Sequence, residues 1–345
     1  MNIDNFTDAI KNCRFCFMCR HLSGIGNVSF SEADTPRVRA SLLYGVTLCP
    51  DNLANPDLID TLYRSDLSAA CRTNCVSHYD ENGLNLAARR DIVALGKAPE
   101  AVAKLAKKLA KNANWQISGK GDVLYFEDDY TAAAKTIAPA FDKLMKAAKV
   151  AYRTVKGGGL GKALYILGYE KEAKAMAKAF ADLVNKSGAK TLVVSNPAAY
   201  DAMVNDYPAF GLKLKAKVVH SSEFIASLKL KFKSAGQLYY LPSDFLKNYN
   251  PGYAGPEKLL KALKAKLLPF GTNDEESYTC GEGAVVLPAL YPELVKKLAK
   301  YIAERADNPK TDKIAVASPY TRIYLAKEGK LNVLSLEELA AACLA

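Results

Sequence analysis

The segment VLYFEDDY occupies residues 123–130 and marks the point where the character of the chain changes. Its first four residues are a short run of β-formers, and an amphipathic helical pattern follows through Ala151. Such alternation predicts layered α/β structure with largely parallel sheets. Further strand patterns are TLVVS (191–195), KVVH (217–220), QLYYL (237–241), AVVL (284–287) and KIAVAS (313–318), and helical patterns around 169–187, 257–267 and 288–306 separate several of them.

This part of the chain also repeats itself. VLYF resembles QLYY (237–240), and TLVVSNP, which ends at Pro197, resembles KIAVASP, which ends at Pro319. The glycines at 157–159 and the TCG at 279–281 lie at the same offset as the second pair. Ordered matches at nearly constant spacing predict a duplicated α/β unit, which we place at 120–235 and 236–345.

Residues 1–115 have a different pattern, irregular and mainly helical. Short helical patterns lie around Thr35–Leu43, Pro56–Ser68 and Leu84–Leu95. The pair Thr35-Pro36 is typical of a helix N-cap followed by proline at the first helical position. We therefore expect a separate helical domain over 1–115 and an α+β multidomain protein.

Composition narrows the class of protein. The chain has 345 residues, half of them hydrophobic, and a formal charge of +11. No run approaches the ~18 apolar residues that span a bilayer, and the start MNIDNFTDAI lacks the basic and apolar regions of a secretory signal. We expect a cytoplasmic protein, with no nucleic-acid-binding signature.

Lysines in Ala/Leu-rich helices, as in PEAVAKLAKKLAKNA from Pro99, form solvated faces or a docking surface. Such a surface would bind an acidic partner or the inner face of the membrane.

Six of the eight cysteines fall within residues 13–75, which favours metal or redox chemistry over disulfides. Cys13, Cys16 and Cys19 are spaced C-x2-C-x2-C. Three thiolates at this spacing can hold one face of an iron–sulfur cube, with the fourth ligand supplied from elsewhere. Cys49 and Cys343 have no assigned role.

A second run supplies that ligand. In bacterial-type ferredoxins, the fourth cysteine of C-x2-C-x2-C-x3-C binds the other cluster. In LYRSDLSAACRTNC (62–75), the last two cysteines have the spacing of third and fourth ligands, and counting back by threes reaches two serines. Exchange then pairs Cys13, Cys16 and Cys19 with Cys75, and pairs Ser65, Ser68 and Cys71 with Ser23.

The first set is all thiols, whereas the second keeps one. Because a serine hydroxyl loses its proton far less readily than a thiol, we predict one [4Fe–4S] cluster and a vestigial second site. Zinc in an all-cysteine site is the main alternative, and free thiols are the other.

Nine segments carry a resemblance to a known family: CRFCFMC, TPRVRASLL, LYRSDLSAACRTNC, VLYFEDDY, GGGLGKA, TLVVSNPAAY, LYYLPSDFLKNY, TCGEGA and IAVASPY. On these the chain resembles the iron–sulfur subunits of the heterodisulfide reductase C/B and glycolate oxidase iron–sulfur subunit type. The resemblance implies an α-helical ferredoxin-like domain over 1–115, followed by two CCG-type α/β domains. It also implies an electron-transfer role beside a FAD-containing partner, such as a 2-hydroxyacid dehydrogenase.

Most of the family's CCG cysteines are missing. In the first unit their places read Glu127-Asp128-Asp129, Gly157-Gly158-Gly159 and Asn196-Pro197-Ala198-Ala199, and in the second Leu241-Pro242-Ser243-Asp244, Thr279-Cys280-Gly281 and Ser318-Pro319-Tyr320-Thr321. Only Cys280 survives, so the resemblance no longer implies the family's non-cubane cluster or disulfide reduction. It implies two remodelled pockets lined by Asp128, Asp129, Asp244 and Cys280.

The sequence therefore favours a non-catalytic electron-transfer subunit of a hetero-oligomeric oxidoreductase. Its partners would be a catalytic flavoprotein or metalloenzyme subunit and another electron carrier. One alternative is a structural or adaptor subunit whose cluster serves as a folding staple. The other is a remodelled CCG domain that binds a small molecule.

Overall fold

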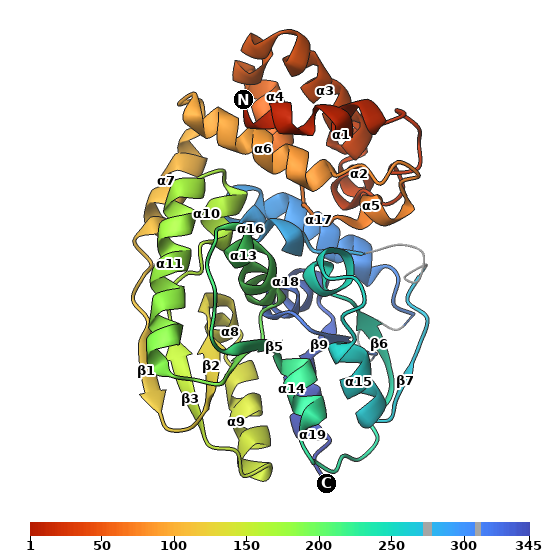
Figure 1. Ribbon diagram of the computed structural model, residues 1–345. Helices are drawn as coiled ribbons and strands as arrows, with labels where there is room; N and C mark the ends of the chain where they lie inside the picture. Colours follow the sequence, from red (N-terminus) through yellow and green to blue (C-terminus); the bar gives the residue numbers. More distant parts are fainter. Residues whose placement is uncertain (272–277, 308–311) are drawn as a thin grey trace.

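The computed structural model describes residues 1–271, 278–307 and 312–345. A helical N-terminal part lies above two sheets that stand side by side, and the C-terminus lies at the end remote from the helical part (Figure 1). This arrangement places the cysteine-rich segments on one end of the molecule.

The N-terminal part contains seven α-helices and three short 3-10 helices among the described residues. Helix α3 begins at Pro36, directly after Thr35, as the sequence predicts, but it continues past Leu43 to Leu48, whereas α4 ends before Ser68. The helices are α1 (Thr7–Asn12), α2 (Gly24–Ser29), α3 (Pro36–Leu48), α4 (Pro56–Tyr63), α5 (Ala70–Asn74), α6 (Glu81–Ala94) and α7 (Glu100–Ala110), with η1 (Asn2–Phe6), η2 (Glu32–Asp34) and η3 (Pro50–Ala54).

The first sheet has five strands in the order β1-β3-β2-β4-β5. Only β1 runs antiparallel, to β3, and the other neighbours are parallel. Its elements are β1 (Gln116–Gly119), β2 (Val123–Glu127), α8 (Asp129–Ala133), α9 (Ile137–Ala147), β3 (Tyr152–Lys156), α10 (Lys162–Ile166), α11 (Glu170–Ser187), β4 (Thr191–Val194), α12 (Pro197–Asp201), the π-helical η4 (Ala202–Asp206), α13 (Tyr207–Ala209), β5 (Lys217–His220) and α14 (Ser221–Ser227).

The second sheet is parallel throughout, in the order β7-β6-β8-β9. Its elements are β6 (Gly236–Leu241), the π-helical η5 (Phe245–Tyr249), α15 (Gly255–Ala262), β7 (Ala265–Leu267), η6 (Glu282–Ala284), α16 (Leu287–Leu290), α17 (Pro292–Ala303), β8 (Lys313–Val316), α18 (Pro319–Gly329), β9 (Asn332–Ser335) and α19 (Leu336–Ala342). In each sheet the first strand of the parallel set lies between the second and the third, with the fourth at the far edge.

One predicted strand is wrong. The run AVVL (284–287) contains no strand, because η6 ends at Ala284 and α16 begins at Leu287. Its valines are nevertheless buried in the core beneath the N-terminal helices. A short apolar run reports burial but does not distinguish a strand from a helical turn. The helical pattern at 257–267 is likewise too long, since α15 ends at Ala262 and β7 follows.

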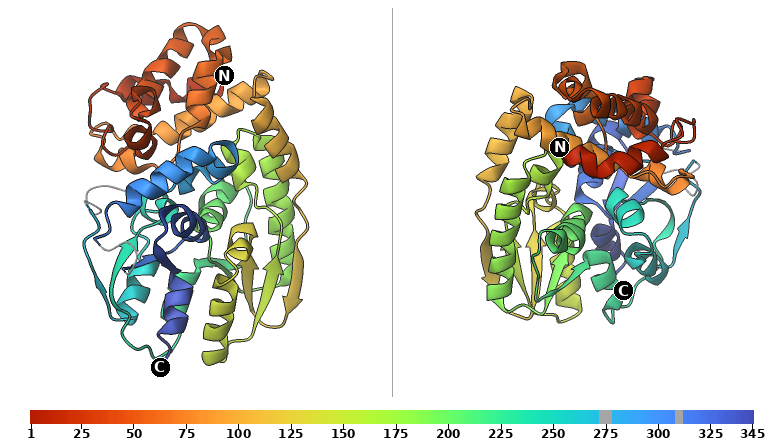
Figure 2. Two further views of the ribbon diagram at one scale, coloured as in Figure 1. Left: turned by 180° about the vertical axis from the view of Figure 1, so that it is seen from behind. Right: turned by 45° about the horizontal axis from the view of Figure 1, so that its top comes forward.

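The three parts share their hydrophobic cores. One buried cluster joins N-terminal residues such as Leu62 and Ile92 to Leu167 of the first unit and Leu298 of the second. Seen from behind in Figure 2, α17 runs directly beneath the N-terminal helices, and it contacts α2. A second cluster joins the two sheets through α9, α14, α15 and α19. The cysteine-rich part is therefore packed firmly on the α/β body.

Candidate metal centre

The structure brings five cysteines to one cavity. Cys13 follows the end of α1, and Cys16 and Cys19 lie in the loop before α2. Cys71 lies in α5, and Cys75 follows its end. All five line one cavity at the end of the helical part, together with Tyr79 and Glu81. The two segments that sequence spacing singles out thus meet in space.

Backbone amides already point at two of these sulfurs. The N–H of Phe15 donates to Cys13 Sγ, and the N–H of Arg37 donates to Cys19 Sγ. Phe15 has a positive φ of 50°, uncommon for a bulky residue and typical of a loop built around a site. Burial raises the pKa of the Cys13 thiol and raises that of Cys19 to about 11, whereas each amide donor lowers it. Metal binding would have to displace these protons, and the amide donors favour the thiolates that result.

Cys71 is placed differently from the other four. It is buried, and its thiol donates a hydrogen bond to the carbonyl oxygen of Cys19 at 3.5 Å. Burial, with the nearby Glu81 carboxylate, raises the pKa of Cys71 well above its usual value. This thiol supports the loop that carries Cys19.

The residues present fit a metal centre held by several thiolates. Among the described residues, no three His, Cys, Asp or Glu side chains are arranged as ligands of a single ion. Four cysteines that hold a cubane cluster bind four different irons, so they surround a volume rather than converge on a point. Tyr79 also lines this cavity, and its hydroxyl is buried, yet the hydroxyl has no hydrogen-bond partner within 1–271, 278–307 and 312–345. An orphaned buried hydroxyl costs about 1–3 kcal/mol, which a bound group with sulfur acceptors would offset.

Charged side chains pack around the residues of the predicted vestigial second site. Ser23 Oγ and Arg39 Nη1 donate to the same carbonyl oxygen, that of Asp34, each at 2.9 Å. Arg39 is buried and pairs with Glu81, its Nε lying 2.6 Å from Oε1. These two side chains interact electrostatically with Cys71.

The other vestigial positions surround a buried aspartate. Asp66 lies between Ser65 and Ser68, and its carboxylate accepts from the N–H groups of Ser68 (3.1 Å) and Ile25 (3.2 Å). Ser65 Oγ accepts from the N–H of Leu67. The residues of the predicted second site are thus engaged with polar groups of the protein itself.

An exposed apolar rim borders the cysteine cavity. Phe15, Phe17, Met18 and Val76 are all exposed, Phe17 by 70% and Val76 by 76%. The Arg37 guanidinium lies 4.3 Å above the ring of Phe17. Exposed apolar side chains grouped at a functional cavity are typical of a surface that contacts another protein.

The first remodelled site is a small cavity of about 120 Å³. Asp128 and Asn196, which follow β2 and β4, meet there, with Asn196 Nδ2 2.5 Å from Asp128 Oδ2. Thr131 donates twice to the other oxygen of Asp128, from N–H at 3.0 Å and from Oγ1 at 2.5 Å. Burial raises the pKa of Asp128, although these donors lower it. Asp129 lies at the exposed mouth, where it accepts from Asn112 at 2.7 Å.

The second remodelled site is a closed network. Asp244 is buried and accepts from Thr279 Oγ1 at 2.5 Å and from the N–H of Gly283 at 3.2 Å. Its own N–H donates to Glu282 Oε2 at 3.0 Å, while Ser243 Oγ donates to Oε1 at 3.0 Å. Cys280 is 1% exposed beside these carboxyls, and burial raises the pKa of its thiol. Sequence spacing brought out Asp244 and Cys280 but not Glu282, their closest acidic neighbour.

We expect the stability of the protein to fall as the pH rises through the titration of Glu282. Burial raises its pKa from the usual 4.5 to about 7. A raised carboxyl pKa means that the folded state binds more protons, so its stabilising effect is complete below about 4.5 and lost by about 7. Glu282→Gln should remove up to about 3 kcal/mol of this pH dependence. Denaturant unfolding at pH 5 and pH 8 would measure it, with the exposed Glu293→Gln as control. If the difference in unfolding free energy between the two pH values were the same in Glu282→Gln as in the wild type, the assignment would be wrong.

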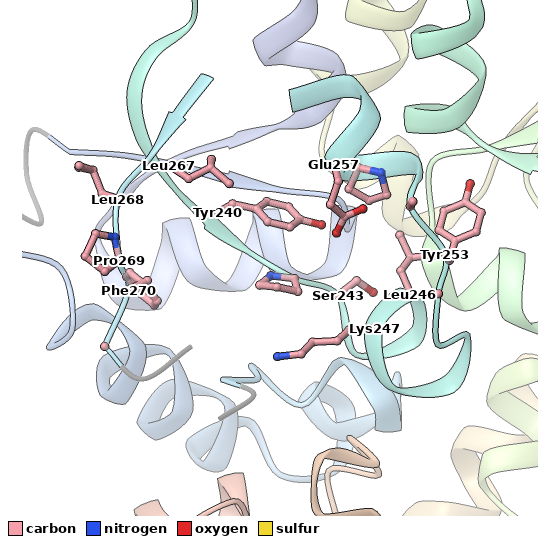
Figure 3. Close-up of a pocket in the computed structure, with 15 residues that line it drawn as sticks. Tyr240, Ser243, Leu246, Lys247, Tyr253, Glu257, Leu267, Leu268, Pro269 and Phe270 are labelled. Carbon is pink, nitrogen blue, oxygen red and sulfur yellow. The ribbon is translucent and has the colours of Figure 1, made fainter. Parts of the chain in front are cut away.

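A larger cavity lies elsewhere, beyond the carboxyl end of β6. It has a volume of about 990 Å³ and is lined by Tyr240, Ser243, Lys247, Glu257 and Phe270 among others (Figure 3). Five of its lining residues fall in the segment LYYLPSDFLKNY that the resemblance marked, namely Tyr240, Pro242, Ser243, Leu246 and Lys247. Sequence patterns did not predict this cavity, because the rest of its lining comes from separate stretches between Gly252 and Gly271.

A thiol-lined cavity with an apolar rim, on a body of two largely parallel β-sheets, defines a candidate metal-binding redox protein. No family model matches the chain. Over 212 residues it is 27% identical to a protein of Syntrophomonas wolfei named EtfAB:quinone oxidoreductase, an alignment that covers 58% of this chain and 28% of that protein. Over 163 residues it is 28% identical to the probable iron-sulfur-binding oxidoreductase FadF of Bacillus subtilis, covering 45% and 23%.

The chain thus spans about a quarter of the length of the curated relatives that it matches. Both relatives are oxidoreductases by name, and one is named as iron–sulfur-binding. The chain is therefore similar, at low identity, to two oxidoreductases, one of which is named as a probable iron–sulfur-binding protein. Within the described residues, no helix has both the length and the apolar character needed to cross a membrane.

Proposed function

We propose that this chain is a non-catalytic electron-transfer subunit that carries one [4Fe–4S] cluster on Cys13, Cys16, Cys19 and Cys75. The observation that carries the proposal is the meeting of both cysteine segments at one cavity. The closed second site supports a single cluster, because Arg39, Glu81 and Asp66 fill the space around Cys71. The name of the iron–sulfur-binding relative points the same way.

We also propose the fold that goes with this function, an α-helical ferredoxin-like domain followed by two degenerate CCG-type units. The shared strand order of the two sheets supports duplication of one α/β unit. The meeting of Asp128 with Asn196, and of Asp244 with Cys280, supports an ancestral ligand site in each unit.

When bound, the cluster would supply one-electron transfer. The chain's own residues would do the rest: four cysteines hold it, the amides of Phe15 and Arg37 donate to its sulfurs, and the packed helices limit its contact with water. Because the chain has no flavin fingerprint, we place FAD and the substrate chemistry on a partner subunit in the cytoplasm. The apolar rim around Phe17 would form the contact with that partner. One relative's name gives EtfAB and quinone as its redox couple, so a partner of either kind fits.

A second candidate function is small-molecule binding in the first unit, which the cavity of about 120 Å³ beside Asp128 favours. The adaptor alternative, with the cluster as a folding staple, requires neither binding nor redox change. A redox titration separates the relay from the adaptor.

Protein purified without oxygen should be brown and hold about four irons per chain. A potentiometric titration followed by electron paramagnetic resonance should show one cluster that takes up one electron. A cluster that no accessible potential reduces would rule out the relay and leave the adaptor. Bound zinc, or no metal at all, would rule out both.

A further inference from the structure

The Tyr79 hydroxyl is an unexplained feature of the cysteine cavity. Tyr79 is 6% exposed, and its ring packs in the main hydrophobic cluster. Its hydroxyl oxygen is buried and has no hydrogen-bond partner among the residues that the structure describes. Buried hydroxyls in folded proteins are nearly always paired, so an orphan beside a candidate site points to a missing acceptor.

The surroundings of Tyr79 narrow down that acceptor. The groups close enough to interact with it electrostatically include Glu81, Arg39, Cys13 and Cys19. Arg39 offers only donors, and the Tyr79 hydroxyl makes no hydrogen bond to Glu81, whose Oε1 lies 2.6 Å from Arg39 Nε. The remaining neighbours are two of the proposed cluster ligands.

We infer that the Tyr79 hydroxyl donates a hydrogen bond to a sulfur of the thiolate-held cluster and thereby raises its reduction potential. This inference rests on the proposed function. A donor at a sulfur stabilises the more negative, reduced state more than the oxidised state, and hydrogen bonds to sulfur are one of the factors that set cluster potentials. The backbone amides of Phe15 and Arg37 donate to the sulfurs of Cys13 and Cys19. Tyr79 differs from them in being a side-chain donor, which a single substitution can remove.

The test is Tyr79→Phe in the full chain, reconstituted with iron and sulfide without oxygen. Iron content should match the wild type, because no ligand is lost. The midpoint potential should fall, with about a tenfold change in the equilibrium with a mediator dye, equivalent to about 59 mV for one electron. The matched control is Tyr63→Phe, a buried tyrosine of the same domain whose hydroxyl donates to Leu167 O at 3.0 Å. Its potential should equal that of the wild type.

A second variant covers the case in which Tyr79→Phe loses its cluster. Placing 3-fluorotyrosine at position 79 keeps the shape of the ring and makes the hydroxyl a stronger donor, so the potential should rise above wild type. A potential unchanged by fluorination, or by Tyr79→Phe with the cluster intact, would overturn the inference and leave the proposed function standing. A wild-type chain without a reducible cluster would instead overturn the proposed function.

Discussion

Replacing Cys75 with alanine should reduce the iron bound from about four per chain to nearly none, and the brown colour should disappear. Cys75 lines the same cavity as Cys13 and Cys16, and it interacts electrostatically with Cys13. Three thiolates leave one iron of a cubane cluster without a protein ligand. Iron analysis and visible absorption of anaerobically reconstituted protein would measure the loss.

Cys71→Ala should be compared with Cys75→Ala, because Cys71 lines the same cavity but is not a predicted ligand of the cluster. Its buried thiol donates to the carbonyl of Cys19 and so has a structural task. We expect this variant to keep its iron and lose only a modest amount of stability, and the exposed Cys49→Ala should behave like wild type. If Cys71→Ala lost the cluster and Cys75→Ala kept it, the ligand assignment would be wrong.

The second large effect should follow from Lys162→Met, which breaks a buried ion triad. Lys162 Nζ lies 2.6 Å from Asp201 Oδ2 and 2.8 Å from Asp206 Oδ2, and the Asp201 side chain is 1% exposed. Burial lowers the pKa of Lys162, but the two carboxylates more than offset this and hold it above its usual value. Removing the cation leaves two buried carboxylates without it, which should cost about 3–5 kcal/mol of unfolding free energy.

The cost of Lys162→Met should be visible in denaturant unfolding at neutral pH. Lys174→Met is the control, because Lys174 forms an exposed pair with Glu170, worth under about 1 kcal/mol. Adding Asp206→Asn to Lys162→Met should recover part of the loss, since one unpaired charge disappears. Equal effects of Lys162→Met and Lys174→Met would show that the triad is not stabilising.

The strands that the sequence predicts correctly are the buried ones. β2, β4 and β8 are apolar runs whose residues are almost all buried. Because a strand covered on both faces needs apolar side chains throughout, its sequence is recognisable. The edge strand β1 was not predicted, because all four of its residues, QISG, are exposed and its pairing with β3 is invisible to any local pattern. The short β7 was not predicted either, because its three residues lie at the end of the helical pattern at 257–267.

The residues of the candidate site likewise fall into those that the sequence predicted and those that it did not. Thiols have few roles inside a protein, so their spacing alone predicted that Cys13 and Cys75 meet at one cavity. The Arg39–Glu81 pair joins residues 42 positions apart, and ordinary charged residues carry no sign of such a partner. Tyr79 was missed for the same reason, because only the coordinates show that its hydroxyl is unpartnered.

The hydrophobic cluster shared by all three parts, together with two hydrogen bonds above it, bears on how the protein melts. Tyr249 donates to Leu67 O at 2.5 Å and Asn248 to Ser68 O at 2.8 Å, above the hydrophobic cluster that runs through all three parts. Parts joined in this way should unfold in a single cooperative transition. Ligation at the cysteines should therefore raise the melting temperature of both sheets together, and limited proteolysis should release no stable α/β fragment.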